Sequence, residues 1–196
     1  LIFVEVVRHP LYMLIQQTIN MENLIDNPRD IKICYNKNGI QYPFYAYGWE
    51  RKFKKYKPVE KAIYLMFVQT VECNRIRKKI LKKYNKNFIS IPFERFVLQP
   101  NNYLNKLKKL LGTKFSKDTE NILYEGRIPR TKIADGMPLP IYERCGWKPS
   151  KKNNTEREEL DLRRNFAVKK LASKSLLTLL DKSSSDYEKK HLKGLI

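Results

Sequence analysis

The sequence predicts an α/β domain built on a parallel sheet with flanking helices. Residues 1–7 are short, β-branched and almost entirely apolar, as is typical of a strand buried on both faces of a parallel sheet. Pro10 then begins a helical pattern that reaches Asn20. A second short strand is predicted over 88–92, after a long helical pattern over 58–84. Strand, turn and helix in this order are the units from which α/β domains are built.

An inserted β-hairpin is predicted after the first helix. Asn38-Gly39 separates two strand-like runs, 31–35 and 40–49, and an Asn-Gly pair in this position is a strong hairpin signal. The second run is unusually aromatic, with Tyr42, Phe44, Tyr45, Tyr47 and Trp49. Two interpretations stay open: a half-buried hairpin that packs on the domain, or a ribbon that lines an acceptor groove for a sugar or peptide.

The helix over 58–84 is followed by an amphipathic helix predicted over 100–111 and by a short helix over 118–125. The helix over 58–84 comes after a basic connector over 52–57. Its own first half is apolar and its second half is basic, and the basic half is interpreted as a solvated face or as a phosphate-binding patch. Gly112 ends the second helix, as a C-terminal glycine commonly does.

The chain is predicted to divide into a partial α/β domain over 1–149 and a helical C-terminal extension over 150–196. The first part ends in a long connection over 126–149, punctuated by glycine and proline, and connections of this length are more often functional than inert. The extension is expected to contain one polar helix over 155–181, which the serines at 183–185 break before a short basic tail.

The charge balance suits an anionic partner. The 196 residues include 40 Lys and Arg against 20 Asp and Glu, so the formal net charge is +20. Of the 40 basic residues 28 are Lys, and Asn and Ile are also plentiful, as an A/T-rich coding sequence would produce. The charge is therefore interpreted either as background composition or as an extended nucleic-acid surface.

Several classes of protein are disfavoured. The three cysteines lie far apart with no CxxC pair, which favours a reducing compartment and the cytoplasm over a zinc site or a disulfide framework. His9 and His191 are the only histidines, so a multi-histidine metal site is excluded. No apolar run approaches about 20 residues, so no membrane span is expected. The chain begins at Leu1 within an apolar run, and we expect it to be the C-terminal part of a longer, N-terminally truncated protein.

Arg8 is the first candidate site residue. The common phosphate-binding loops GxxxxGK[ST] and GxGxxG are absent from the sequence. In open α/β sheets, however, ligands bind at the carboxyl ends of the strands, and Arg8 follows the first strand at that edge. The next helix adds N-terminal amide groups, so a phosphate-sized anion site is expected there. The alternative is that Arg8 pairs with a nearby carboxylate.

Residues 1–16, with Arg8-His9-Pro10 after a hydrophobic strand, resemble the 3′-phosphate-binding segment of sulfotransferases, which use 3′-phosphoadenosine 5′-phosphosulfate. The family pattern is a strand, then Arg-Asp/Asn-Pro, then a helix with Ser six residues beyond the Pro. His9 stands at the Asp/Asn position and Gln16 at the Ser position. The resemblance implies that Arg8 binds the 3′-phosphate and that Gln16 donates its amide to the same phosphate.

A second segment is similar to a later strand of the same family, which reads Tyr-Glu-Asp-Leu, then Asn-Pro, then a helix that ends in Leu-Gly. Here the strand continues into Phe93-Glu94-Arg95-Phe96, and Gln99-Pro100 precedes a helix that ends at Gly112. Phe93 replaces Tyr and Arg95 replaces Asp. The two matches together cover about residues 1 to 115 and imply a P-loop-type sheet whose first strands are missing.

The resemblance also places the sulfate-binding loop and the catalytic base N-terminal to this chain, so the catalytic residues are unknown and the chain alone is expected to be inactive. Its basic lid over the nucleotide would correspond to Arg127, Arg130 and Lys132, for which a solvated loop is the alternative. No metal is required, because basic side chains can neutralise the phosphates.

The function that follows is transfer of a sulfuryl group from 3′-phosphoadenosine 5′-phosphosulfate to a hydroxyl or amine of a glycan or small molecule. One alternative is a basic nucleic-acid-binding protein that uses the aromatic hairpin as a stacking platform. Another is a nucleotide kinase of related fold.

Overall fold

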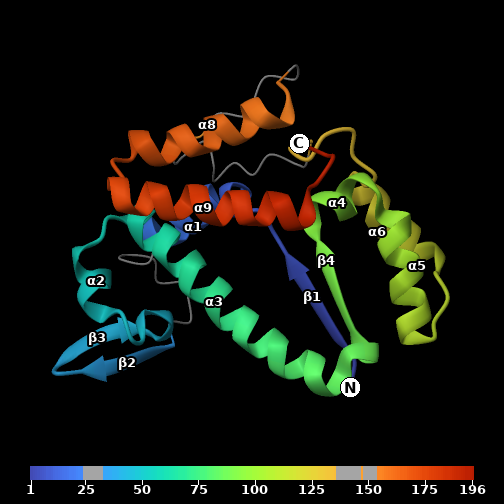
Figure 1. Ribbon diagram of the computed structural model, residues 1–196, viewed down its shortest axis with the longest axis horizontal. Helices are drawn as coiled ribbons and strands as arrows, with labels where there is room; N and C mark the ends of the chain where they lie inside the picture. Colours follow the sequence, from blue (N-terminus) through green and yellow to red (C-terminus); the bar gives the residue numbers. More distant parts are fainter. Residues whose placement is uncertain (24–32, 136–146, 148–153) are drawn as a thin grey trace.

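The computed structural model describes residues 1–23, 33–135, 147 and 154–196. It has the predicted α/β character, with helices around a small parallel sheet and a separate antiparallel hairpin (Figure 1). In the parallel sheet β1 (Phe3–Val7) pairs with β4 (Phe88–Pro92), in a register that runs from Phe3 opposite Phe88 to Val7 opposite Pro92. Both strands were predicted, and no further strand of this sheet lies within the described residues.

The expectation that the first strand is buried on both faces is wrong. Val4 is 48% and Val6 is 63% exposed. On the opposite face the ring of Phe3 packs 5.3 Å from that of Tyr84, and the carboxylate of Glu5 binds Arg77, both from the long helix α3 (Pro58–Tyr84). Among the described residues α3 covers the face of β1 that carries Phe3 and Glu5, whereas the face that carries Val4 and Val6 is partly open to solvent.

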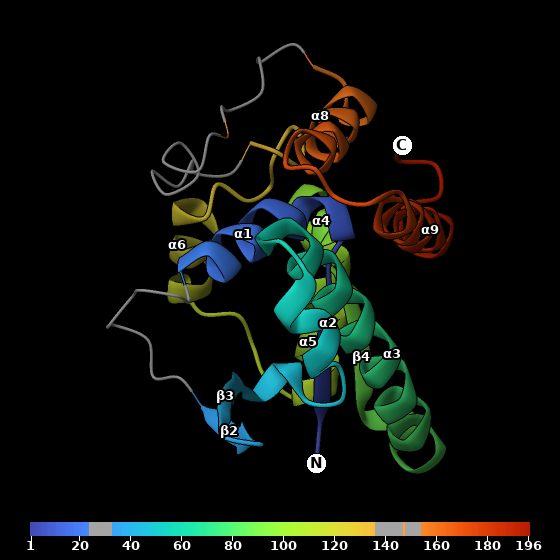
Figure 2. The ribbon, with the colours of Figure 1, turned by 90° about the vertical axis from the view of Figure 1, so that its left-hand side faces the viewer.

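The main core lies where the N-terminal and C-terminal helices meet. Here α1 (Pro10–Asn23) contacts α3, α8 (Glu156–Lys169) and α9 (Lys174–His191), and Figure 2 shows α8 and α3 on either side of α1. Leu14, Ile63, Leu160 and Leu180 are each at most 2% exposed within one apolar cluster. Burial of such side chains contributes about 1.5–3 kcal/mol each. The helical segment beyond residue 150 therefore shares its core with α1 and α3.

The prediction of a single helix over 155–181 is wrong in its end point. The helix begins as predicted, with Thr155 and Glu158 forming a capping box, but α8 ends at Lys169 and Leu171 adopts a left-handed φ of 60°. α9 then runs through the serines that were expected to break it. Ser184 is only 4% exposed, so its small side chain faces the packed side of α9, where packing outweighs low helix propensity.

The predicted hairpin is present but shorter. β2 (Cys34–Lys37) and β3 (Ile40–Pro43) flank Asn38 and Gly39, whose φ angles of 53° and 77° are those of a type I′ turn. The aromatic run beyond Pro43 is not a strand: it forms a 3₁₀ turn, η1 (Phe44–Ala46), and then α2 (Glu50–Lys55), where a connector was predicted. Trp49 is 6% exposed in a small second cluster with Ala62 and Leu65, and this packing turns the chain away from the hairpin.

The remaining helices match the predicted patterns closely. The predicted bounds of α3 and of α5 (Pro100–Leu111) are confirmed, and Gly112 ends α5 in the left-handed conformation with a φ of 64°. Between them lie η2 (Asn85–Asn87) and a short helix that was not predicted, α4 (Phe93–Leu98); α6 (Lys117–Glu125) follows. Of the 126–149 connection, 136–146, 148 and 149 lie outside the described residues.

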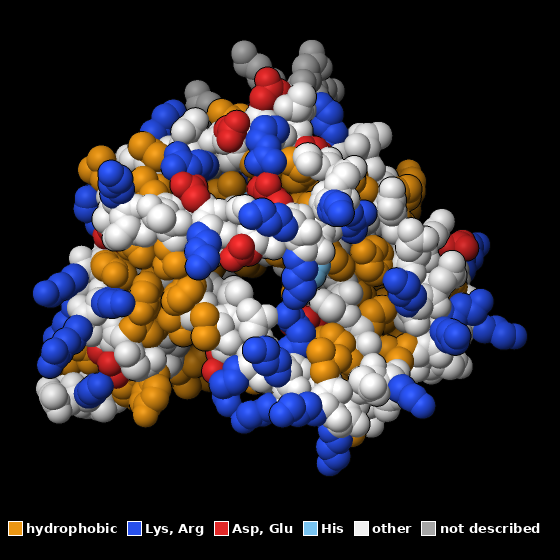
Figure 3. Space-filling model, viewed as in Figure 1, with side chains coloured by type: hydrophobic (Ala, Val, Ile, Leu, Met, Phe, Trp, Pro, Cys, Tyr) orange, Lys and Arg blue, Asp and Glu red, His pale blue; other side chains and the backbone are white. Residues whose placement is uncertain are grey.

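The molecular surface is strongly basic in places. Figure 3 shows Lys and Arg side chains gathered over the second half of α3, with few acidic side chains among them. None of the described helices combines the length and the apolar character that crossing a membrane requires.

Candidate anion-binding site

The candidate site lies where β1 and β4 end. Because the strands are parallel, their carboxyl ends meet at one edge of the sheet, which is where α/β proteins bind ligands. Arg8 follows β1 at this edge and Phe93 follows β4. The guanidinium carbon of Arg8 lies 4.6 Å from the centre of the Phe93 ring, a distance typical of a cation–π contact.

A second arginine reaches the same ring from a distant part of the chain. The guanidinium carbon of Arg130 lies 5.7 Å from the centre of the Phe93 ring. The backbone of Arg130 donates to the carbonyl of Val97 in α4 at 2.7 Å, and its Nη1 donates to the carbonyl of Ile133 at 3.0 Å. The segment after α6 is thus docked on α4, and it brings a second cation to the edge of the sheet.

Both arginines have a buried donor without a hydrogen-bond partner in the described part of the chain, and the charge of one acts on the other. The Nε atoms of Arg8 and Arg130 are both buried, and neither has a hydrogen-bond partner among the described residues. Burial and the neighbouring charge of Arg8 lower the pKa of Arg130. An unpaired buried donor costs about 1–3 kcal/mol, and two like charges at close range add to that cost. An anion placed between the guanidinium groups would relieve both.

The alternative for Arg8, an ion pair with a carboxylate, is not found within the described part of the chain. Glu94 is the neighbouring carboxylate, and it is fully buried. Its Oε1 accepts the backbone N–H of His9 at 2.9 Å, and its Oε2 accepts the hydroxyl of Tyr187 at 2.5 Å. Burial raises the pKa of Glu94. Glu94 therefore fastens the turn after β1 to α9.

His9 explains how this turn is built. Its Nδ1 accepts the backbone N–H of Leu11 at 3.1 Å, and its Nε2 lies 3.2 Å from Oε1 of Glu188. A ring nitrogen thus caps α1, which is the role that an Asp or Asn side chain has at a helix N-terminus. Burial of the ring lowers the pKa of His9 to about 4, so the imidazole is neutral at pH 7 and its proton is on Nε2.

The expected amide donors of α1 are occupied. Pro10 has no N–H, the N–H of Leu11 is bound by His9, and those of Tyr12 and Met13 both donate to the carbonyl of His9. Any anion at this edge would consequently be bound by side chains, with α1 contributing only its dipole.

The other predicted site residues lie elsewhere. Gln16 donates its amide to Asn20 on α1 at 2.9 Å, and Arg127 is exposed at the end of α6 with a φ of 52°. Nζ of Lys132 donates to the carbonyl of Asn154 at 2.7 Å, so this side chain lies toward the beginning of α8. The structure thus brings together Arg8 and Arg130; Gln16 and Arg127 form no hydrogen bond or ion pair with them among the described residues.

Two residues that matter here were not singled out as site residues from the sequence. Phe93 was recognised only as a replacement for Tyr, although its ring lies against both guanidinium groups. Tyr187 had no local signal at all, because its partners Val7 and Glu94 lie 180 and 93 residues away in the chain.

Within the described residues no three His, Cys, Asp or Glu side chains gather closely enough to hold a metal ion. A comparison with protein-family models, curated proteins and solved structures finds no match to this chain. A functional assignment therefore rests on the chemistry of Arg8 and Arg130, the two arginines that lie against the Phe93 ring. We call this pair the paired-arginine site.

Proposed function

We propose that this chain carries the 3′-phosphate-binding part of a sulfotransferase that uses 3′-phosphoadenosine 5′-phosphosulfate. The proposed reaction moves the sulfuryl group to a hydroxyl or amine of a glycan or small molecule. The observation that carries the proposal is the convergence of Arg8 and Arg130 on the Phe93 ring at the carboxyl edge of a parallel sheet.

A phosphate dianion suits this pair for two reasons. Guanidinium groups bind phosphate through short, charge-assisted hydrogen bonds that are about twice as strong as neutral ones. The buried Nε donors that lack a protein partner would gain an acceptor, and the repulsion between the two cations would fall. In sulfuryl transfer the 3′-phosphate is remote from the reacting sulfur. Arg8 and Arg130 would therefore bind and orient the donor and take no part in proton transfer.

Calorimetric titration of the chain with adenosine 3′,5′-bisphosphate tests the proposal. We expect adenosine 5′-monophosphate, which lacks the 3′-phosphate, to bind at least tenfold more weakly. Arg8→Ala and Arg130→Ala should each weaken bisphosphate binding by about 2–3 kcal/mol, as loss of a charge-assisted contact does. Arg75→Ala is the matched control, because Arg75 is an exposed arginine paired with Glu72 on α3. Equal affinity for the two nucleotides, or unchanged affinity in Arg8→Ala, would refute the assignment.

Nucleic-acid binding is the second candidate, and the exposed basic half of α3 favours it (Figure 3). Binding through this face would depend steeply on salt, because each neutralised phosphate releases a counterion. Retention of an oligonucleotide that falls steeply with salt and is insensitive to Arg8→Ala would favour this second function over the first.

A further inference from the structure

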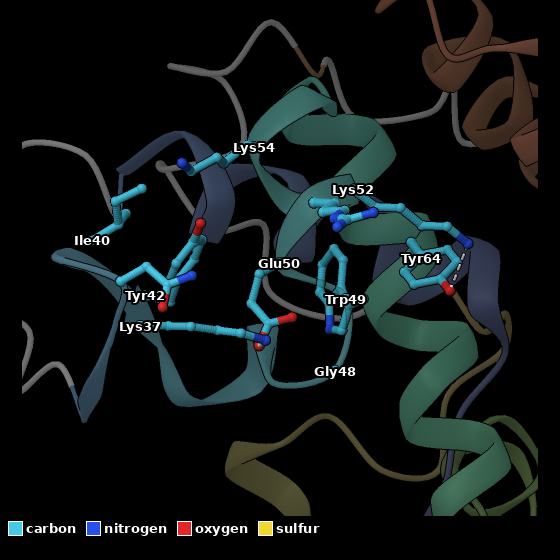
Figure 4. A pocket seen from close by; sticks show the side chains of 11 residues that line it. Lys37, Ile40, Tyr42, Gly48, Trp49, Glu50, Lys52, Lys54 and Tyr64 are labelled. Atoms are coloured by element: carbon cyan, nitrogen blue, oxygen red, sulfur yellow. Dashed lines mark hydrogen bonds and ion pairs between the residues drawn. The ribbon is translucent and has the colours of Figure 1, made fainter.

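A separate cavity lies between the β2–β3 hairpin and α2. Its volume is about 570 Å³, within the range of sites for small ligands. Trp49 and Tyr42 line it, and Tyr64 of α3 contributes to its wall (Figure 4). The hairpin lies toward the end of the molecule at which β1 begins, whereas Arg8 follows the other end of β1 (Figures 1 and 2). The cavity is therefore distinct from the paired-arginine site.

The lining of the cavity carries an excess of positive charge. Four basic side chains line it, together with a single carboxylate, that of Glu50. The basic residues are Lys37, Arg51, Lys52 and Lys54. This carboxylate is already engaged, since its Oε1 accepts from Nζ of Lys37 at 2.7 Å and from the hydroxyl of Tyr35 at 2.9 Å. Arg51 and Lys54 have no carboxylate partner within the described ranges. The cavity thus complements an anion.

The aromatic side chains do not offer open ring faces. Nζ of Lys52 lies 4.3 Å from the centre of the Tyr64 ring and donates to the Tyr64 hydroxyl at 2.9 Å (Figure 4). Nζ of Lys54 lies 5.7 Å from the centre of the Tyr42 ring. Trp49 is 6% exposed, and its indole nitrogen donates to the carbonyl of Tyr45 at 2.7 Å. A base that stacks on a protein needs a free aromatic face. Here the ligand would instead meet ammonium groups held over the rings, with ring edges and tyrosine hydroxyls beside them.

We propose that this cavity binds an acidic saccharide, a sugar ring that carries carboxylate or sulfate groups. The anionic groups would contact Arg51 and Lys54, which charge-assisted hydrogen bonds favour. The sugar hydroxyls would bind the hydroxyl of Tyr42, and that of Tyr64, which accepts from Lys52, can still donate to one of them. The proposal is independent of the sulfotransferase assignment, because it uses no residue of the paired-arginine site.

The test uses ¹⁵N-labelled chain and a sulfated disaccharide that contains a uronic acid. The indole N–H of Trp49 is the reporter, since it lies in the lining of the cavity. We expect a saturable shift of this signal, and no shift with an uncharged disaccharide at the same concentration. Lys54→Gln should weaken binding at least fivefold. Lys55→Gln is the matched control, because Lys55 is the next, exposed lysine of α2 and does not line the cavity.

Several results would overturn the proposal. One is equal binding of the uncharged disaccharide, and another is an equal loss of affinity in Lys55→Gln, which would indicate general surface charge. Displacement of the disaccharide by lower concentrations of oligothymidylate or hexaglutamate would assign the cavity to nucleic acid or acidic peptide. Arg8→Ala should leave the disaccharide affinity unchanged, which separates this test from that of the nucleotide site.

Discussion

His9 joins three parts of the molecule through one buried ring. Its backbone N–H binds Glu94, its Nδ1 caps α1 at Leu11, and its Nε2 contacts Glu188 on α9. Glu188 in turn accepts from Arg157 of α8 at 2.9 Å, so the ring contacts a charged network while it is itself neutral. A substitution at this position therefore separates the capping role from the contact with α9.

The stability of the chain should fall in acid because of His9. The pKa of His9 is about 4 in the folded chain and about 6.5 when unfolded, so the unfolded state binds the proton more readily. The contribution of the neutral ring is complete above pH 6.5 and is lost as the pH falls toward 4. Between pH 7 and pH 5 the loss should be about 2 kcal/mol of the free energy of unfolding.

Urea denaturation of the wild type and of His9→Asn at both pH values measures this loss. An Asn at the cap can still accept the N–H of Leu11 but does not titrate, so the dependence on pH should be flatter by about 2 kcal/mol. His191, whose pKa is also lowered to about 4, and Glu94 titrate in both proteins and cancel in the difference. Burial opposes ionisation of Glu188, but Arg157 and also His9 lower its pKa, so this carboxylate is ionised between pH 5 and pH 7 in the wild type. Identical pH dependence of the two proteins would show that His9 is not the group responsible.

At the scale of elements, the sequence predicted best those elements whose signals are local. α3 and α5 have long amphipathic patterns, Pro at their first position, and in α5 a glycine at the end. The errors arose where distant packing decides. The aromatic run after Pro43 forms a turn and α2 because Trp49 packs in a cluster with residues of α3. The helix α9 continues through Ser184 because the side of α9 that carries this serine is buried.

The residues of the candidate site differ in how local their signals are. Arg8 was proposed because its place after a strand is a local feature of the chain, and the structure places it at the carboxyl edge of the parallel sheet. Arg130 was proposed only from its position in a basic loop. Of the other proposed residues, Gln16 donates to Asn20 on α1, and Lys132 donates to the carbonyl of Asn154. The role of Tyr187 depends on the docking of α9, which no local pattern of residues indicates.

The attachment of α9 to the sheet should depend on Tyr187. Its hydroxyl donates to the buried Glu94 and lies 3.2 Å from the carbonyl of Val7. Tyr187→Phe leaves a buried carboxylate oxygen without its donor, which should lower the free energy of unfolding by about 2 kcal/mol. Tyr124→Phe is the control: Tyr124 is 84% exposed, and its loss of a hydroxyl should change stability by less than about 0.5 kcal/mol. Equal urea midpoints for the two variants would mean that the hydrogen bond between Tyr187 and Glu94 does not stabilise the fold.

At the scale of the whole molecule, the net charge of +20 attracts anions in general. Binding at one specific site must therefore be distinguished from this general attraction. Like charges repel in the folded chain, so added salt of any kind should stabilise it by screening. The exposed basic half of α3 contributes to this general effect (Figure 3). The paired arginines differ, because their Nε donors are buried and need an acceptor rather than a more concentrated ion atmosphere.

Inorganic sulfate and chloride, compared at equal ionic strength, should therefore stabilise the chain to different extents. Under the proposed function sulfate, a tetrahedral oxyanion like phosphate, would bind Arg8 and Arg130, and binding to the folded state alone raises stability by mass action. At a sulfate concentration ten times its Kd, the gain is about 1.4 kcal/mol, or roughly 3–6 °C in Tm for a chain of this size. Sulfate also stabilises proteins in general by exclusion from their surfaces. The decisive quantity is therefore the extra stabilisation that sulfate gives over chloride. We compare this extra stabilisation in the wild type with that in the double variant Arg8→Ala/Arg130→Ala. We expect this difference to saturate with sulfate concentration, whereas an excess that persists undiminished in the double variant would mean that the two arginines do not form an anion site.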